Sequence, residues 1–276
     1  MLVTRVLTAA VLLAGFLAAI LLLGRAQFGI LVTLAIGAAA WEWARLCRFR
    51  RSSAAFYGVA SAAAFAALAA ALWPIDAGEI PEIAVFGAAA VFWIVVAPLW
   101  LGRGLERADS ALRPWVLPAI AWLVLIPAGL AMLAVPGLHL LAVLALIWIA
   151  DTAAYGAGRA FGRRKLAPHI SPGKTWEGVA GGMLGCAAYA AALAAYTPQL
   201  AALTGGLRWV PYIGAALLLC ALSVVGDLFE SALKRRAGVK DSGSLLPGHG
   251  GVLDRIDSTT STLPVAVLLL HWAGVK

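Results

Sequence analysis

The sequence predicts an all-α integral membrane protein with about nine transmembrane helices, a cytoplasmic amino terminus and a carboxyl terminus on the other side. Three observations lead to this fold class. The 276 residues are 63% hydrophobic and 12% charged, with a mean hydropathy of +0.92, whereas soluble domains carry roughly 25% charged residues. Apolar runs of about 20 residues, the length that spans a bilayer, follow one another almost end to end. Basic residues are concentrated in alternate loops, as in polytopic membrane proteins.

Nine segments meet the length requirement within a few residues, and together they predict one membrane domain, residues 1–276. The first is longer than the apolar core of a signal peptide, roughly 7–15 residues, so we favour a transmembrane helix. The second contains Glu42 and the fifth contains three prolines, so these two are the least well supported. The nine segments are 5–23, 28–45, 54–73, 81–101, 114–132, 137–157, 176–197, 209–230 and 256–273.

The distribution of basic residues predicts the orientation. The amino terminus and four alternate segments, at 45–53, 102–113, 158–175 and 231–255, contain 18 of the 21 Lys and Arg residues. Basic loops stay on the cytoplasmic side, so we expect both large polar segments, 158–175 and 231–255, to face the cytoplasm from a bacterial-type inner membrane. Topology accounts for the net charge of +8, and we expect no nucleic-acid partner.

Small residues indicate where helices pack closely. The alanine-rich stretch 54–71 and the glycines of the seventh segment (Gly178, Gly181, Gly182 and Gly185) allow neighbouring membrane helices to approach. The cysteines show no CxxC spacing and are odd in number, which argues against a disulfide framework or a zinc site. Cys186 and Cys220 lie in apolar runs and are expected to be small buried hydrophobic residues.

The eighth segment ends in a polar helical face. Asp227, Glu230, Ser231 and Lys234 are spaced i, i+3, i+4 and i+7, so they share one side of a helix. An unpaired carboxylate in an apolar span is costly. Asp227 is therefore either an ion-pair partner of Lys234 or Arg235, or part of a functional site.

A second acidic cluster stands at the head of the ninth segment. Asp254 and Asp257 are three residues apart and share a helical face, while Arg255 points elsewhere. Two carboxylates from different helices suit Mg²⁺, which accepts one or two carboxylates together with substrate phosphates and water. Acids for a metal beside bases for phosphate are typical of a phosphoryl- or nucleotidyl-transfer site. His249, in the glycine-rich turn between the clusters, either bonds within the loop or takes part in this site.

The segment before the seventh span contains Asp151 and the sequence Gly173-Lys174-Thr175. A P-loop is excluded, because Pro168 stands where that motif requires glycine. Two interpretations remain. The helix amino terminus seats a phosphate with its backbone amides and Lys174, or Ser171 or Thr175 is a plain helix cap.

At these residues the chain resembles the phosphatidate cytidylyltransferase (CDP-diacylglycerol synthase) family. The family's signature of Ser, Lys-Arg, Lys-Asp, His-Gly-Gly and Asp-Arg-x-Asp is matched throughout. The likeness covers roughly residues 150–260, the expected catalytic region, whereas residues 1–135 resemble the family only as hydrophobic spans. The matching residues are Ser231, Lys234-Arg235, Lys240-Asp241, His249-Gly250-Gly251 and Asp254-Arg255-Ile256-Asp257.

The resemblance implies a reaction of CTP with phosphatidic acid that gives CDP-diacylglycerol and pyrophosphate, with Mg²⁺ and a monovalent cation such as K⁺. It also implies a homodimer and the following residue roles. Asp227 and Asp254 correspond to metal ligands, with Asp241 and Asp257 as candidate further ligands or supporting residues. Substrate-binding positions are Asp151, Lys174, Thr175, Ser231, Lys234 and Arg235, and catalytic positions are Lys240, Asp241, His249, Arg255 and Asp257.

Two alternatives belong to other functional classes. Another CTP-dependent membrane lipid kinase would share basic cytoplasmic loops, but a hydroxyl substrate would need an activating base. A transporter of anionic metabolites would also place charges among helices. Transporter sites tend to lie near the bilayer midplane, whereas these charges lie at one interface, so the transferase is favoured.

Overall fold

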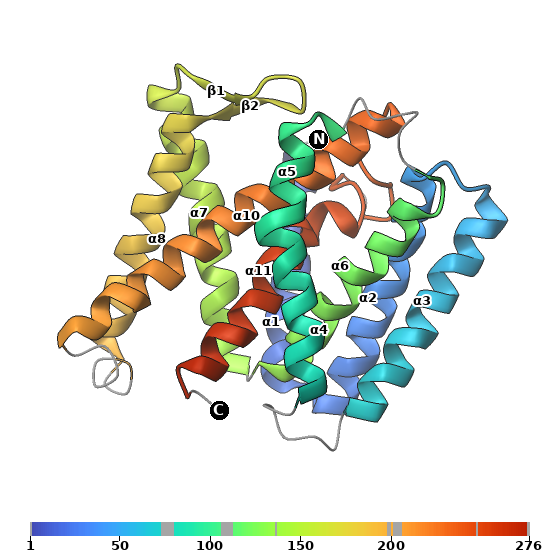
Figure 1. Cartoon of the computed structure of the whole chain (residues 1–276), viewed down its shortest axis with the longest axis horizontal. Coiled ribbons are helices and arrows are strands. Elements are labelled where there is room, and N and C mark those ends of the chain that lie inside the picture. Colours follow the sequence, from blue (N-terminus) through green and yellow to red (C-terminus); the bar gives the residue numbers. More distant parts are fainter. Residues whose placement is uncertain are drawn as a thin grey trace.

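The structure, a computed structural model, describes residues 2–72, 80–105, 113–135, 137–197, 200, 206–246 and 248–274. Helices make up almost all of its regular structure (Figure 1), which confirms the predicted all-α class. The main helices are α1 (Leu2–Leu22), α2 (Arg25–Leu46), α3 (Arg51–Leu72), α4 (Ile80–Val91), α5 (Ala97–Gly102), α6 (Val116–Ala134), α7 (Gly137–Phe161), α8 (Trp176–Tyr196), α10 (Trp209–Ala237) and α11 (Leu253–Trp272); the 3-10 turn η3 (Gly206–Arg208) precedes α10.

Each of the nine predicted spans coincides with helical structure, and within the described residues seven helices are long and apolar enough to cross a membrane. These seven include the second and fifth segments, which were the least well supported. The other two predicted spans correspond to α1, whose stretch Leu13–Leu22 counts as a shorter apolar helix within the described residues, and to α11, which is not among the seven. A polar run at 258–262 reduces the hydropathy of α11.

Two irregularities, a π-helical turn and a proline, are absorbed into the helical spans. In the fourth span, α4 continues through a π-helical turn, η1 (Phe92–Val96), into α5. In the fifth, α6 passes through the buried Pro127 without a break. Neighbouring helices and local adjustments in a membrane bundle can satisfy the backbone groups that a proline leaves without partners.

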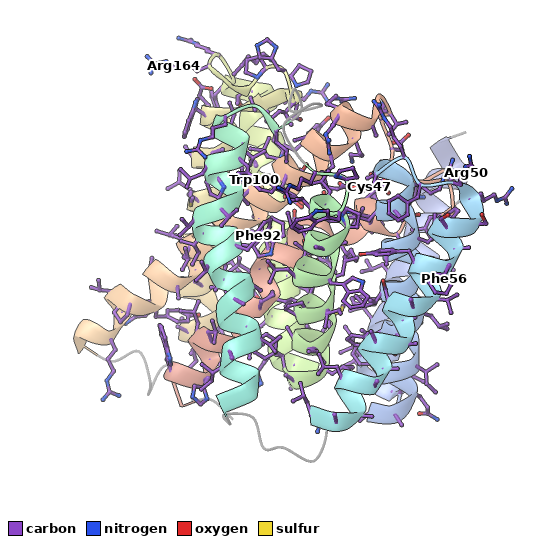
Figure 2. All side chains as sticks on the ribbon, turned by 45° about the vertical axis from the view of Figure 1, so that its right-hand side comes forward. Cys47, Arg50, Phe56, Phe92, Trp100 and Arg164 are labelled. Carbon is purple, nitrogen blue, oxygen red and sulfur yellow. The ribbon has the colours of Figure 1, made fainter. Side chains whose placement is uncertain are left out.

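Side-chain packing separates an inner and an outer surface. Figure 2 shows Phe56 of α3 pointing away from the bundle, and its side chain is 77% exposed. Phe92 is buried at the π-helical turn, and its ring centroid lies 5.4 Å from that of Phe229 on α10. Exposed apolar residues of this kind are expected where a helix faces lipid rather than protein.

Three of the predicted basic segments, 45–53, 158–175 and 231–255, lie at one end of the bundle in their described residues, opposite the carboxyl end of α11 (Figure 1). Arg48, after α2, donates a hydrogen bond of 3.4 Å to the carbonyl of Arg236 near the end of α10. Arg235 donates one of 3.1 Å to the carbonyl of Ile170. Three of the four basic segments are thereby joined, as the alternation of charge predicted.

The predicted loop 158–175 contains unexpected regular structure. Helix α7 extends to Phe161, and β1 (Lys165–Ala167) pairs antiparallel with β2 (Ser171–Thr175) in a hairpin. The strands are too short to show alternating hydrophobicity, so the sequence did not predict them. Because Gly-Lys-Thr lies on β2 itself, it does not form the loop after a strand that a P-loop requires.

Helices α7 and α8 pack through the predicted glycines. A Cβ atom on Gly178 would stand 2.9 Å from the carbonyl oxygen of Ala154, and one on Gly185 would stand 2.8 Å from the Cβ of Ala153. Each contact is too close for any larger residue, so the packing interpretation is confirmed. Cys186 and Cys220 are buried free thiols, also as predicted.

Helix α10 is two turns longer than predicted, which changes the boundary of the second polar segment. Residues 231–237 are helical, so Ser231, Lys234 and Arg235 lie on α10 and the connecting loop is residues 238–252. The buried polar run of α11 holds it against α10, since the hydroxyl of Ser261 donates a hydrogen bond of 2.7 Å to the carbonyl of Leu222.

Candidate active site

The hairpin and α10 meet at an ion pair between two of the predicted site residues. Lys174 Nζ on β2 lies 2.6 Å from Asp227 Oδ2 on α10. The hydroxyl of Ser231, one turn further along α10, donates a hydrogen bond of 3.2 Å to Asp227 Oδ1. The partner of Asp227 is therefore neither Lys234 nor Arg235, the two partners proposed from the helical spacing.

Further carboxylates surround this pair. Asp151 on α7 interacts electrostatically with both Asp227 and Lys174, and Asp257 on α11 does the same. The ammonium group thus lies in the field of three carboxylates from three different helices. Asp151 and Asp257, which are 106 positions apart in the sequence, therefore both act on the ammonium group of Lys174.

A second charged cluster begins one turn further along α10. Lys234 Nζ lies 2.9 Å from Glu230 Oε2 and 2.7 Å from Asp254 Oδ1, and so joins α10 to the first turn of α11. Its side chain is 13% exposed and Glu230's is 3% exposed. Glu230 Oε1 is buried and has no hydrogen-bond partner among the described residues. Lys234 was predicted to bind substrate, but in this structure it is engaged by two carboxylates.

Asp254 organises the loop that precedes α11. Besides the ammonium of Lys234 at Oδ1, it accepts hydrogen bonds at Oδ2 from the Ser242 amide (2.9 Å), the Ser242 hydroxyl (2.9 Å) and the Gly251 amide (2.8 Å). Burial alone would raise the pKa of this carboxyl group, but these donors lower it to about 2. Asp254 is therefore a charged residue whose oxygens are both engaged by protein donors.

Glu42 of α2 binds the same loop through hydrogen bonds. Its side chain is fully buried. The carboxylate accepts hydrogen bonds from the Leu253 amide (2.8 Å) and the Val252 amide (3.1 Å), and it shares the single hydroxyl donor of Ser242 (3.0 Å) with Asp254. In the sequence this charge made the second span one of the two least well supported, and its spacing gave no reason to place it in the site. An ionisable residue inside a membrane span is itself a signal of function.

Glycines make room for the two carboxylates. A Cβ atom on Gly251 would collide with Glu42 and with the hydroxyl of Ser242, and one on Gly250 would stand 2.6 Å from Asp254 Oδ2. Gly250 also has a φ of 79°, a conformation that side chains rarely adopt. The glycines of the family signature therefore fit the shape of this acidic pair.

The remaining predicted residues lie around the loop. Arg235 donates to the carbonyl of Val239 (3.3 Å) as well as to that of Ile170, so it ties the helix end to the hairpin. His249 is half-buried in the turn, where its amide donates to the carbonyl of Leu246 (2.9 Å). Three others have exposed side chains: Lys240, Asp241 and Arg255.

Thr175 is the N-cap of α8. Its hydroxyl accepts a hydrogen bond of 3.1 Å from the Gly178 amide, and the residue is buried. The capping interpretation is thus confirmed for Thr175 and wrong for Ser171, which begins β2. Substrate contact by Thr175 stays a prediction, as does the seating of a phosphate at this helix start.

The carboxylates of this site can be judged by what Mg²⁺ requires of a protein. Within the described residues, no three acidic, histidine or cysteine side chains are close enough to enclose a metal ion. Mg²⁺ does not need such a cage, since one or two carboxylates with phosphate and water suffice. Asp227 fits this role, because one of its oxygens already holds a cation, Lys174, and a second acid, Asp257, lies near. Asp254 would have to release at least one of its four donors.

Comparisons with known proteins agree with this chemistry. The model of the family described as "Cytidylyltransferase family" matches residues 3–273. The chain is similar to the phosphatidate cytidylyltransferase of Pseudomonas aeruginosa, with 41% identity over 99% of this chain and 98% of the relative. It is 37% identical to the enzyme of the same name from Haemophilus influenzae, over 96% of each chain.

A third relative matches a shorter part of the chain at higher identity. The phosphatidate cytidylyltransferase of Brucella suis is 51% identical over 131 residues, which is 47% of this chain and 44% of the relative. The first two matches extend much further and include the amino-terminal helices, which resemble the family in sequence pattern only as hydrophobic spans. The helix that carries Glu42 thus lies within the family match.

Proposed function

The chain belongs to the cytidylyltransferase family. We propose that it transfers the CMP group of CTP to phosphatidic acid, giving CDP-diacylglycerol and pyrophosphate. The observation that carries the proposal is the grouping of Lys174 with Asp227, and of Lys234 with Asp254, at the end of the bundle where the basic loops meet. Both substrates are polyanions. A site for them needs cationic side chains, and acids that hold a cation between phosphates.

In the proposed reaction a phosphatidate oxygen forms a bond to the α-phosphorus of CTP. The bond from that phosphorus to the bridging oxygen breaks, and pyrophosphate leaves with the electron pair. The attacking phosphate is already ionised near neutral pH, so no strong general base is required. The protein contributes mainly alignment and charge neutralisation.

Lys174 has a specific part in this proposal. Without substrate, its ammonium neutralises Asp227. A bound phosphate offers the ammonium a second partner, and an Asp227 oxygen then becomes available to a cation. Arg235, Lys240 and Arg255 are exposed at the same end of the bundle and supply further positive charge for the triphosphate and the lipid phosphate.

Magnesium is proposed as the metal, and Asp227 with Asp257 as the side chains best placed to hold it. When bound, Mg²⁺ would neutralise phosphate charge and polarise the reacting phosphoryl group. A direct contact from Asp254 stays a prediction, and so does the monovalent cation. Asp254 and Lys234 in any case hold α10, α11 and the connecting loop together, which fixes the position of Asp257 relative to Asp227.

We also propose that the site faces the cytoplasm from the inner membrane, with the amino terminus on the same side. The concentration of Lys and Arg at this end supports this orientation. CTP is available there, and the phosphatidate headgroup lies at the same interface. The homodimer implied by the resemblance stays a prediction.

The test is product analysis with the purified full chain, phosphatidate and Mg²⁺. CTP labelled at the α-phosphorus should give lipid-linked label, and CTP labelled at the γ-phosphorus should release its label as pyrophosphate. Lipid carrying the γ-label would instead identify a kinase. The absence of any Mg²⁺-dependent turnover with intact, monodisperse protein would contradict both enzymes and leave the transporter.

A further inference from the structure

Glu42 is a buried carboxylate whose described hydrogen bonds all go to the loop before α11. Its partners are the Ser242 hydroxyl and the amides of Val252 and Leu253. They are 200 to 211 residues away in sequence. The adjacent Trp43, by contrast, donates to the carbonyl of Leu117 on α6, within the helix bundle.

Two of these partners are amides at the amino terminus of α11. Helix starts leave backbone N–H groups without partners inside the helix, and no side-chain cap from Val252 satisfies them here. Glu42 replaces a local cap with a carboxylate from a distant helix. Because the first-turn amides carry partial positive charge, the contact also offsets the cost of burying the acid.

Glu42 is coupled to Asp254 through one side chain. The hydroxyl of Ser242 lies 3.0 Å from Glu42 Oε2 and 2.9 Å from Asp254 Oδ2. The backbone around it is shaped to the carboxylate, because Cβ atoms on Gly243 and Gly251 would both collide with Glu42. The loop thus packs tightly against the Glu42 carboxylate.

We infer that Glu42 is a positioning residue for the transferase site: it fixes the start of α11 and residues 242–252, and through them the placement of Asp254 and Asp257. The inference rests on the proposed function, because the geometry held in place is that of the proposed transfer site. Glu42 itself touches no substrate. Its role extends the site to α2, outside the region that carries the family signature.

Two substitutions separate positioning from simple core packing. Glu42→Gln keeps the side-chain volume but replaces one acceptor oxygen with an NH₂ group. That group donates hydrogen bonds, so it cannot accept from the N–H and O–H groups that now bind Glu42. Glu42→Asp keeps an acceptor-only carboxylate but is one methylene shorter. Positioning by hydrogen bonds predicts that Gln is the more harmful change, whereas packing predicts that Asp is, because it leaves a cavity.

The readouts are kcat and KM for CMP transfer per folded enzyme, and amide hydrogen exchange of the full chain. For Glu42→Gln we expect kcat to fall about 10- to 100-fold, as when reacting groups are slightly misplaced, with faster exchange confined to residues 238–257. Ser61→Ala is the matched control. It removes the buried hydroxyl that accepts a hydrogen bond of 2.9 Å from the indole N–H of Trp122 on α6, without touching the loop, and should leave kcat and loop exchange unchanged.

Wild-type kcat in Glu42→Gln, a Gln variant more active than the Asp variant, or faster exchange throughout the bundle would each overturn the inference. A failure of the proposed function is distinguishable, because it appears as a wild-type protein that makes no lipid-linked CMP. The hydrogen-exchange comparison needs no turnover, so it reports on loop positioning in either case.

Discussion

The Lys174 ammonium lies 2.6 Å from the Asp227 carboxylate, between the hairpin β1–β2 and the long helix α10. Both side chains are about a quarter exposed, at 25% and 30%. An ion pair that is this accessible contributes little to stability, and we propose that its two partners exchange each other for bound ions. The geometry makes Lys174 and Asp227 the first residues to test.

Asp227→Asn should abolish Mg²⁺-dependent CMP transfer and leave the folded protein intact. The substitution keeps the shape of the side chain and removes the negative charge that attracts both Lys174 and a divalent cation. Turnover across a Mg²⁺ titration and the thermal unfolding midpoint are the measurements. If activity returned at high Mg²⁺, Asp227 would be a ligand whose loss weakens metal binding. If the variant kept the wild-type dependence on Mg²⁺, the assignment of Asp227 to the metal would be contradicted.

Lys174→Gln should reduce kcat/KM by about 10- to 100-fold, the effect expected when one charge-assisted hydrogen bond to phosphate is lost. Steady-state kinetics with each substrate varied in turn would identify which phosphate is affected. Glu177→Gln is a useful comparison. Glu177 lies in the first turn of α8, directly after the hairpin, and accepts hydrogen bonds from the amides of Arg163 and Arg164, directly before it. Equal losses in both variants would indicate a structural effect of the hairpin rather than contact of Lys174 with a phosphate.

Asp254→Asn should abolish turnover without loss of expression. The side-chain amide would bring N–H donors against one of the groups that now donate to Asp254: Lys234, Ser242 or Gly251. Radiolabelled CTP measures the activity, and the yield of monodisperse protein measures folding. Near-normal activity would show that neither metal binding nor organisation of the loop depends on this charge.

Gly251→Ala should destabilise the protein by about 1–3 kcal/mol, as overpacking does, and should lower activity. The new methyl group would collide with Glu42 and Ser242. Gly87→Ala on α4 is the matched control, because nothing lies within 4 Å of a Cβ there and alanine favours helices. The two thermal unfolding midpoints in the same detergent give the comparison; equal midpoints would contradict the close fit of Gly251.

Chelation of Mg²⁺ should stop turnover without unfolding the protein. The described residues form no metal cage, so the ion is expected to contribute to catalysis rather than to the fold. Activity should return when Mg²⁺ is added back. A large drop in the unfolding midpoint on chelation alone would point to a structural metal instead.

Much of the fold could be predicted because a bilayer imposes a simple rule. Apolar runs of sufficient length become helices, so helices such as α8 ended within one residue of the prediction. The hairpin and the last two turns of α10 were not predicted. At the membrane surface polar sequence is equally compatible with helix, strand or loop, and contacts such as Arg235 with Ile170 decide among them.

The site was predicted in part for a related reason. Spacing along one helix placed Glu230 and Lys234 on the same face, and the structure shows them paired. It also suggested Lys234 or Arg235 as the partner of Asp227, whereas the partner is Lys174, 53 residues away in sequence. Helical periodicity describes neighbours within an element and carries no information about which element packs alongside.

The sequence by itself determined the membrane class, the alternation of basic loops and the family signature, because each depends on residue type and local spacing. The tertiary structure decided which charges face one another. It brought Glu42 of α2 against the start of α11, and Lys174 of the hairpin against Asp227. Such pairings arise because a buried carboxylate must find donors wherever the packing of helices provides them, and that packing is a property of the whole bundle.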